Sequence, residues 1–119
     1  MQNQAIAISI KKEPITYTLV ALSQRISFDT SSEIEKKLYM LLDSGHRKIV
    51  INCQHLVSID MQVVGLLLGF HRNIISSDGN LIFCNMNNRI HETITQLGLS
   101  SIFHISANES EAVEFLKTE

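Results

Sequence analysis

The clearest pattern of apolar and polar positions runs from Ile49 to Ile75. It begins with the apolar run Ile49–Ile51, which is typical of a strand buried on both faces, as in a parallel sheet. After a polar segment, the apolar run Val63–Phe70 predicts a helix that extends to about Ser77. Asp60 is placed to cap this helix, because its carboxylate can accept hydrogen bonds from the free N–H groups of the first turn. In open α/β sheets, the crevice between such a strand and the next helix often carries function.

The residues before this stretch predict a hairpin followed by a helix. Ala5–Ile10 and Ile15–Leu22 have the composition of strands, and Pro14 between them indicates a break. The two are expected to pair as a hairpin, with the first strand at the edge of the sheet. Thr30 and Glu33 have the spacing of a capping box, which predicts that a helix begins at Thr30. The apolar face and the end of this helix are expected to be formed by Ile34, Leu38, Leu41, Leu42, Ser44 and Gly45.

The residues after Ser77 predict two further strand–helix units. The turn at 76–80 leads into the apolar strand Leu81–Cys84, and Ile102–Ile105 predicts a short last strand. The third helix is expected to be capped by Asn87 or Asn88 and to end at Gly98. The last helix is expected to be capped by Asn108, with Glu111 three residues further on. The element order is therefore β-β-α-β-α-β-α-β-α. It predicts one α/β domain over residues 1–119, with a mostly parallel sheet of four to five strands and about four helices.

Composition and charge exclude several classes of function. A net charge of −2, with the basic residues scattered, gives no basis for binding nucleic acid or an anionic membrane. The longest apolar run, Val63–Phe70, is far shorter than the roughly 20 residues of a transmembrane helix, so no span is expected. There is no secretion signal at the N-terminus, and Cys53 and Cys84 are expected to be buried free thiols. These features predict a cytoplasmic protein.

Catalytic and ligand-binding motifs are largely missing. There is no glycine-rich phosphate loop, and the histidines show no metal-ligand spacing, so neither a cofactor nor a metal is expected. The nearest approach to a nucleophilic site is Cys53 with His55, which alternation places on one side of the chain. Cys53 is more simply a small core residue. Gly65 and Gly69 are expected to let their helix pack closely on the sheet or on a partner, which leaves room for a homodimer.

The segment Ile49–Asp60 and the residues after it resemble the STAS domain, and within it the anti-sigma-factor antagonists of bacterial partner-switching systems. The resemblance covers nearly the whole chain and implies a STAS-type fold with the element order given above. The family's run of an apolar residue and Asp-Ser-Ser-Gly-Leu-Gly corresponds to Ile59-Asp60-Met61-Gln62-Val63-Val64-Gly65. Further matching segments are Leu67-Leu68-Gly69, Gly79–Asn85, Thr95–Phe103 and Asn108–Ala112.

The resemblance implies a phosphorylation switch that this sequence lacks. In these antagonists the second serine after the aspartate is phosphorylated by a partner kinase that doubles as an anti-sigma factor. That position is Gln62 here, and the first serine is Met61. A glutamine has no hydroxyl and cannot accept a phosphoryl group. Two hypotheses follow: the protein binds its partner without phosphorylation control, or it has a different partner and role.

Neighbouring residues also depart from the family pattern. The usual glycine after the two serines is Val63, and the Gly-x-Leu-Asp segment after the second strand reads Gln24-Arg25-Ile26-Ser27. Other hydroxyls are poor replacements for the missing serine. Ser58 is expected to pack with the strand, whereas Thr30, Ser31 and Ser32 are expected to be exposed cap and turn residues.

The resemblance implies a non-catalytic protein-interaction module, not an enzyme, with a switch kinase or anti-sigma factor as its partner. The expected contact residues are Gln24, Arg25, Ser27, Asp60, Met61, Gln62 and Val63. For Asp60, the competing interpretation is that it only caps the helix. For Met61 and Val63, the competing interpretation is that they pack in the core. Gln62 is expected to face outward. The alternative function is a STAS component of a lipid or transport system, or a small-ligand-sensing module. Its support is the apolar helix Val63–Phe70.

Overall fold

The fold is built on a sheet whose strand order follows the sequence, β1-β2-β3-β4-β5. The structure is a computed structural model and describes residues 6–23, 26 and 28–118. These residues form the five strands β1 (Ile6–Lys11), β2 (Tyr17–Leu22), β3 (Lys48–Asn52), β4 (Asn80–Cys84) and β5 (His104–Ser106). The four helices are α1 (Phe28–Asp43), α2 (Met61–Ser76), α3 (Asn88–Gln96) and α4 (Glu109–Lys117). The predicted order of elements is confirmed.

The first strand lies at one edge of the sheet and is its antiparallel member. β1 pairs with β2 so that Ile6 lies opposite Leu22 and Lys11 lies opposite Tyr17. The pairs β2–β3, β3–β4 and β4–β5 are all parallel. The predicted edge hairpin and the mostly parallel sheet are therefore both confirmed.

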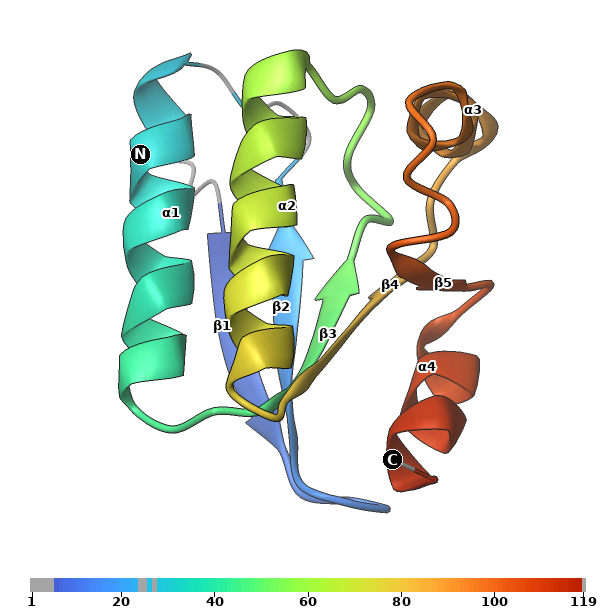
Figure 1. Cartoon of the computed structure of the whole chain (residues 1–119). Coiled ribbons are helices and arrows are strands. Elements are labelled where there is room, and N and C mark those ends of the chain that lie inside the picture. Colours follow the sequence, from blue (N-terminus) through green and yellow to red (C-terminus); the bar gives the residue numbers. More distant parts are fainter. Residues whose placement is uncertain (1–5, 24–25, 27, 119) are drawn as a thin grey trace.

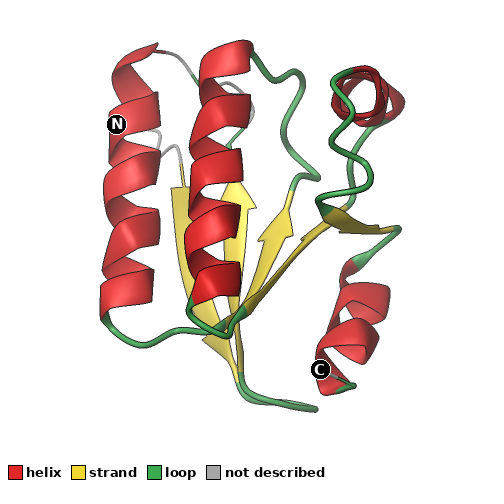
Figure 2. Ribbon diagram, in the orientation of Figure 1, coloured by secondary structure: helices red, strands yellow, loops and turns green. Residues whose placement is uncertain are grey.

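Helices cover both faces of the sheet, as Figures 1 and 2 show. In β3, Ile49 and Ile51 point into the larger core, which they share with α1 and α2, whereas Val50 belongs to a smaller cluster with residues of α4. All three side chains are fully buried. The prediction that this strand is buried on both faces is confirmed. α3 lies beyond the carboxyl ends of the parallel strands and adds Ile90 and Ile94 to the larger core.

Several boundaries differ from those expected: β1 is Ile6–Lys11 and not Ala5–Ile10, and β2 begins at Tyr17 and not at Ile15. The prediction that a helix begins with a capping box at Thr30 is wrong, because α1 already begins at Phe28 and Thr30 lies within its first turn. The last strand is His104–Ser106, whereas Ile102–Ile105 was expected. Phe103 precedes this strand and is buried, with its ring centroid 4.7 Å from that of Phe83. The apolar residue that suggested a strand therefore packs from a loop.

The two glycines of α2 do not pack on the sheet, contrary to one of the expectations for them. A Cβ on Gly69 would lie 3.8 Å from the hydroxyl of Tyr39, so this glycine faces α1. A Cβ on Gly65 would meet no atom within 4 Å, and Gly65 is exposed. The small residues of α2 thus permit contact with α1 at Gly69 and leave an open surface at Gly65.

Candidate functional site

The site lies where α2 begins, beyond the carboxyl end of β3. Asp60 has extended backbone angles (φ −102°, ψ 173°) and its Oδ1 accepts a hydrogen bond of 2.9 Å from the backbone N–H of Val63. The predicted helix cap is confirmed. Such a cap stabilises a helix by about 1 kcal/mol. Asp60 is itself exposed, so the carboxylate marks the surface of the site as well as starting the helix.

The three residues after Asp60 divide between surface and core. Val63 is 1% exposed and packs in the larger core, which confirms the core-packing interpretation for it. Core packing is wrong for Met61, whose side chain is 64% exposed. At about 100° per residue, Met61 is rotated by about 200° from Val63 and points away from the sheet. Gln62 is exposed, as expected.

Gln62 also makes a contact between helices that the sequence did not predict. Its Nε2 donates a hydrogen bond of 3.3 Å to the hydroxyl oxygen of Ser31 on α1. Ser31 is only 3% exposed, so the expectation of an exposed cap or turn residue is wrong for it. The reason is that Ser31 lies three residues before buried Ile34 and so shares the inward face of α1. The first turns of α1 and α2 are thereby joined by side chains.

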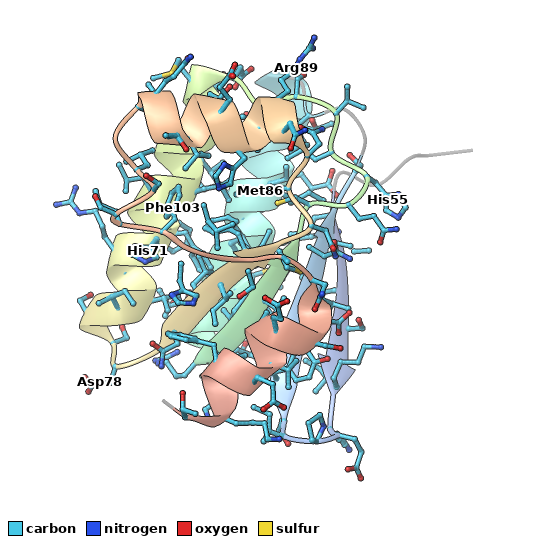
Figure 3. The ribbon with its side chains drawn as sticks, turned by 90° about the vertical axis from the view of Figure 1, so that its right-hand side faces the viewer. His55, His71, Asp78, Met86, Arg89 and Phe103 are labelled. Atoms are coloured by element: carbon cyan, nitrogen blue, oxygen red, sulfur yellow. The ribbon has the colours of Figure 1, made fainter. Side chains whose placement is uncertain are left out.

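The loop from Cys53 to Asp60 presents several exposed side chains. Leu56 is 2% exposed and anchors the loop in the core, whereas Val57 is 45% exposed. Ser58 is exposed too, and the expectation that it packs with the strand is wrong, because β3 already ends at Asn52. Figure 3 shows His55 on the outer side of this loop.

An asparagine of α3 fixes the position of this loop. The Nδ2 of Asn87 donates hydrogen bonds of 3.1 Å to the backbone oxygens of both Leu56 and Val57. Its Oδ1 accepts a bond of 2.8 Å from the N–H of Ile90 and so caps α3, as predicted. The sequence carries the signal for the cap but none for the link to a loop about 30 residues away. The loop is therefore held from two sides, by the core and by α3.

Two further asparagines join the ends of two strands beside the loop. Asn85 Nδ2 donates a hydrogen bond of 3.0 Å to Asn52 Oδ1, which also accepts one of 2.9 Å from the N–H of Gln54. Asn85 adopts a left-handed backbone (φ +59°), which asparagine tolerates better than most residues. These bonds fix how the chain leaves β3 and β4. They order the base of the loop without presenting a reactive group.

The suspected pair of Cys53 and His55 is not assembled. Cys53 is 1% exposed, whereas His55 is exposed, so the two side chains do not share one side of the chain. Burial raises the pKa of the Cys53 thiol to about 12, with a smaller contribution from neighbouring Cys84. A thiol with such a pKa stays protonated and is a weak nucleophile at neutral pH. Cys53 acts as a core residue, and neither cysteine forms a disulfide.

The remaining predicted contact residues are Gln24, Arg25 and Ser27, which lie outside the described residues. Among the residues that the structure does describe, no group of three or more histidine, cysteine or acidic side chains could hold a metal ion. Within the same residues, no helix is both long and apolar enough to cross a membrane. What the described part of the site offers is a mixed surface: Asp60 and Gln62 beside exposed Met61 and Val57.

The family model described as the STAS domain matches residues 7–112. The chain belongs to the STAS domain family. The match begins one residue into β1 and ends in the first half of α4, so β2 to β5 and the whole Asp60 turn lie inside it.

Solved structures of similar fold include two anti-sigma factor antagonists and an RsbS variant. A putative anti-sigma factor antagonist from Thermotoga maritima has a TM-score of 0.83 at 21% identity, over 94% of both chains. An RsbS variant from Moorella thermoacetica has a TM-score of 0.80 at 16% identity, over 95% of both chains. The anti-sigma factor antagonist SpoIIAA in its unphosphorylated form has a TM-score of 0.77 at 20% identity, over 95% of this chain and 98% of its own. The phosphorylated form of Bacillus SpoIIAA is similar as well, with a TM-score of 0.70 at 21% identity, over 92% and 99%. At these identities the likeness shows that this STAS domain shares their fold.

Proposed function

We propose that this STAS domain is a non-catalytic protein-interaction module of the anti-sigma-antagonist kind, which binds a switch kinase or anti-sigma factor through the surface around Asp60–Val63. Binding at this surface is not controlled by phosphorylation of residue 62. The observation that carries the proposal is the exposure of Met61 and Gln62 together on the first turn of α2. The protein acts by stoichiometric binding, in the cytoplasm where such a partner works.

The chemistry of the surface suits a protein partner. Met61 is 64% exposed and Val57 is 45% exposed, and both belong to a turn and loop that are anchored from below by Val63 and Leu56. Exposed apolar side chains rimmed by polar groups mark interaction sites, and methionine is enriched in protein interfaces. The carboxylate of Asp60 places a negative charge at the rim of this surface, where a basic group of the partner can pair with it. Gln24, Arg25 and Ser27 stay predicted contact residues on the same proposal.

Gln62 explains why the surface is proposed to be constitutive. Phosphorylation of a serine adds a charge of about −1.5 to −2. Here such a group would stand two residues from the Asp60 carboxylate, and a partner surface fitted to a neutral side chain would have to desolvate it at a cost of several kcal/mol. The neutral amide of Gln62 leaves the surface with the charge of an unmodified serine. SpoIIAA, by contrast, has both an unphosphorylated and a phosphorylated form.

No specific observation among the described residues favours the alternative functions. The transport-component interpretation rested on the apolar residues of α2, but Val63, Val64, Leu67 and Phe70 are buried in the protein's own core. An enzyme built on Cys53 and His55 lacks the required pairing. We therefore propose the interaction module alone.

A binding experiment with a purified partner tests the proposal. The immobilised protein is used to identify a switch kinase or anti-sigma factor from native lysate, and the affinity of the purified pair is then measured by calorimetry. Met61→Asp should weaken binding by at least tenfold, whereas Ile75→Asp, a control at an exposed apolar residue near the other end of α2, should not. Equal loss in both variants, or in neither, would overturn the assignment of the surface.

A second measurement addresses regulation at Gln62. With the partner kinase and ATP, the intact mass of the wild-type protein should not change, and its affinity should be the same as without ATP. Gln62→Ser should gain a single phosphate and lose affinity only when ATP is present. One phosphate per molecule of the wild-type protein would contradict the proposal that binding is not controlled by phosphorylation. The acceptor would then be another hydroxyl, such as that of exposed Ser58.

A further inference from the structure

β1 stands at the edge of the sheet. β1 ends the strand order, and among the described residues only β2 pairs with it. Five of its six residues are exposed, all except Ile6. The N–H and C=O groups along such an edge are ready to form a ladder with another strand. This edge lies beside α1, and β5 forms the opposite edge of the sheet (Figure 1).

β1 lacks the features by which proteins usually protect an edge strand. Its register with β2 runs without interruption from Ile6 to Lys11, so no bulge twists the edge away. There is no proline in the strand, and its single charged residue, Lys11, stands at its end. Edges are normally protected by shortness, proline, bulges or charges within the strand. A regular, six-residue, mostly apolar edge is therefore suited to pairing.

An apolar groove continues from this edge onto α1. Ile8 and Ile10 are 38% and 46% exposed, and they share with Ile6 the face of the sheet that α1 covers, because side chains two residues apart in a strand point the same way. The groove has a volume of about 410 Å³ and is lined by Ile6, Ile8, Lys37, Met40, Leu41 and Ser44. Met40 is 61% exposed. Apolar side chains on both sides of the groove would be covered if a further strand were added to the sheet.

We propose that the β1 edge pairs with the β1 edge of a second copy of this chain. An antiparallel pair of identical strands is related by a two-fold axis, so the same residues face each other on both sides. Opposed residues in an antiparallel pair point to the same face, so Ile8 lies opposite an isoleucine at position 6, 8 or 10 of the partner strand. With the axis at Ser9, Ile8 lies opposite the partner's Ile10, and Ile10 lies opposite the partner's Ile8.

The charge pattern is compatible with this arrangement. Pairing about Ser9 sets Lys11 opposite the partner's Ala7, so the two lysines stand at opposite ends of the new ladder and do not repel each other closely. The partner's strand also brings its isoleucines toward the groove beside Met40 and Leu41. The strand can thus pair with itself in hydrogen bonding and in apolar contacts without bringing its lysines together, which favours a second copy as the occupant.

The proposed dimer leaves the Asp60 turn free. The two-fold axis stands perpendicular to a continuous ten-stranded sheet, so the parallel strands of the two copies run in opposite directions. The two Asp60–Val63 surfaces then lie at opposite ends of the dimer. This inference is independent of the proposed function, because neither β1 nor the groove contributes a residue to that surface.

Sedimentation equilibrium over about 1 to 500 μM protein tests the proposal, a range chosen because edge pairing gives a small interface. The wild-type mass should rise with concentration from 13.4 kDa toward twice that value. Ile8→Lys and Ile10→Lys should each weaken dimerisation by at least tenfold, because they place a charge in the strand interior. Ile75→Lys is the matched control, an isoleucine of α2 that is 47% exposed and should have no effect.

Amide hydrogen exchange supplies a second measurement that does not depend on a variant. The N–H groups on the outer edge of β1 should become protected as the protein concentration rises, and Ile8→Lys should abolish that change. A wild-type protein that stays monomeric throughout would overturn the proposal. So would a dimer that Ile8→Lys and Ile10→Lys leave intact while both variants fold, as judged by their thermal unfolding.

Discussion

Gln62 of α2 donates a hydrogen bond to the hydroxyl of Ser31 on α1, over 3.3 Å between Nε2 and Oγ. The donor is exposed at the candidate binding surface, whereas the acceptor is buried between the helices. The residue that replaces the family's phosphorylated serine thus also ties the surface to the helix behind it. A serine at position 62 would be too short to make the same contact.

A double-mutant cycle should detect this coupling. Gln62→Ala and Ser31→Ala each remove one partner, and the energy of interaction between them should be about 0.5–1 kcal/mol, the usual net value of a neutral hydrogen bond. Urea unfolding of the four proteins measures it. Gln96→Ala with Ser31→Ala is the control pair, since Gln96 is an exposed glutamine on α3. Strictly additive effects in the test pair would show that the contact contributes nothing.

Asn87→Asp should loosen the loop before α2 while keeping the cap of α3. Aspartate retains the acceptor for the N–H of Ile90 but loses both donors to the oxygens of Leu56 and Val57. Hydrogen exchange of the amides at 56–60 should become about five- to tenfold faster, as expected for two lost hydrogen bonds.

The control for Asn87→Asp is Asn108→Asp. Asn108 caps α4 in the same way, by accepting a hydrogen bond of 2.9 Å from the N–H of Glu111. No link from Asn108 to the loop is seen among the described residues, so this variant should leave exchange at 56–60 unchanged. An equal effect of both variants would mean that Asn87 acts on stability in general.

His71 should make the protein less stable in mild acid. Its side chain is 9% exposed, and burial lowers its pKa below the ordinary value of 6.5. Because the folded-state pKa is the lower one, the contribution to stability is present above pH 6.5 and is lost as the pH falls. His71→Phe should reduce the decline in the free energy of unfolding as the pH falls below about 6.5. His91→Phe, at an exposed histidine, should retain it.

Both cysteines should be unreactive in the folded protein. Burial raises the pKa of Cys53 to about 12 and that of Cys84 to about 11, so neither forms an appreciable amount of thiolate at pH 8. An aromatic disulfide reagent should label them only at the rate of unfolding, and quickly after denaturation. Met61→Cys, at a side chain that is 64% exposed, should add one thiol that reacts at once. Rapid labelling of the wild-type protein would contradict the burial of these thiols.

Most of the fold could be predicted because its signals are local. Continuous apolar runs such as Ile49–Ile51 indicate strands buried on two faces, and Asp60, Asn87 and Asn108 are capping residues that act within three positions of themselves. The error at Thr30 has the same origin. Its spacing to Glu33 satisfies a local rule, but the chain continues the helix upstream to Phe28.

The site was harder to predict because its geometry depends on contacts between distant segments. Asp60 and Gln62 could be placed from the start of a helix, whereas the exposure of Met61 depends on how α2 is rotated against the sheet. The links from Gln62 to Ser31 and from Asn87 to Val57 join segments about 30 residues apart, and neither has a sequence pattern. Ser58 was misplaced for a related reason, since its surroundings depend on where β3 ends.

The amide side chain of Gln62 has a consequence for how cells would use this protein on the proposed function. Without a covalent on–off state at that position, the fraction of partner that is captured depends on the abundance of the two molecules and on their dissociation constant. Synthesis and degradation then become the regulated steps. Output would change sharply only when the copy number of this chain passes that of its partner, so the system would behave as a titration with a threshold.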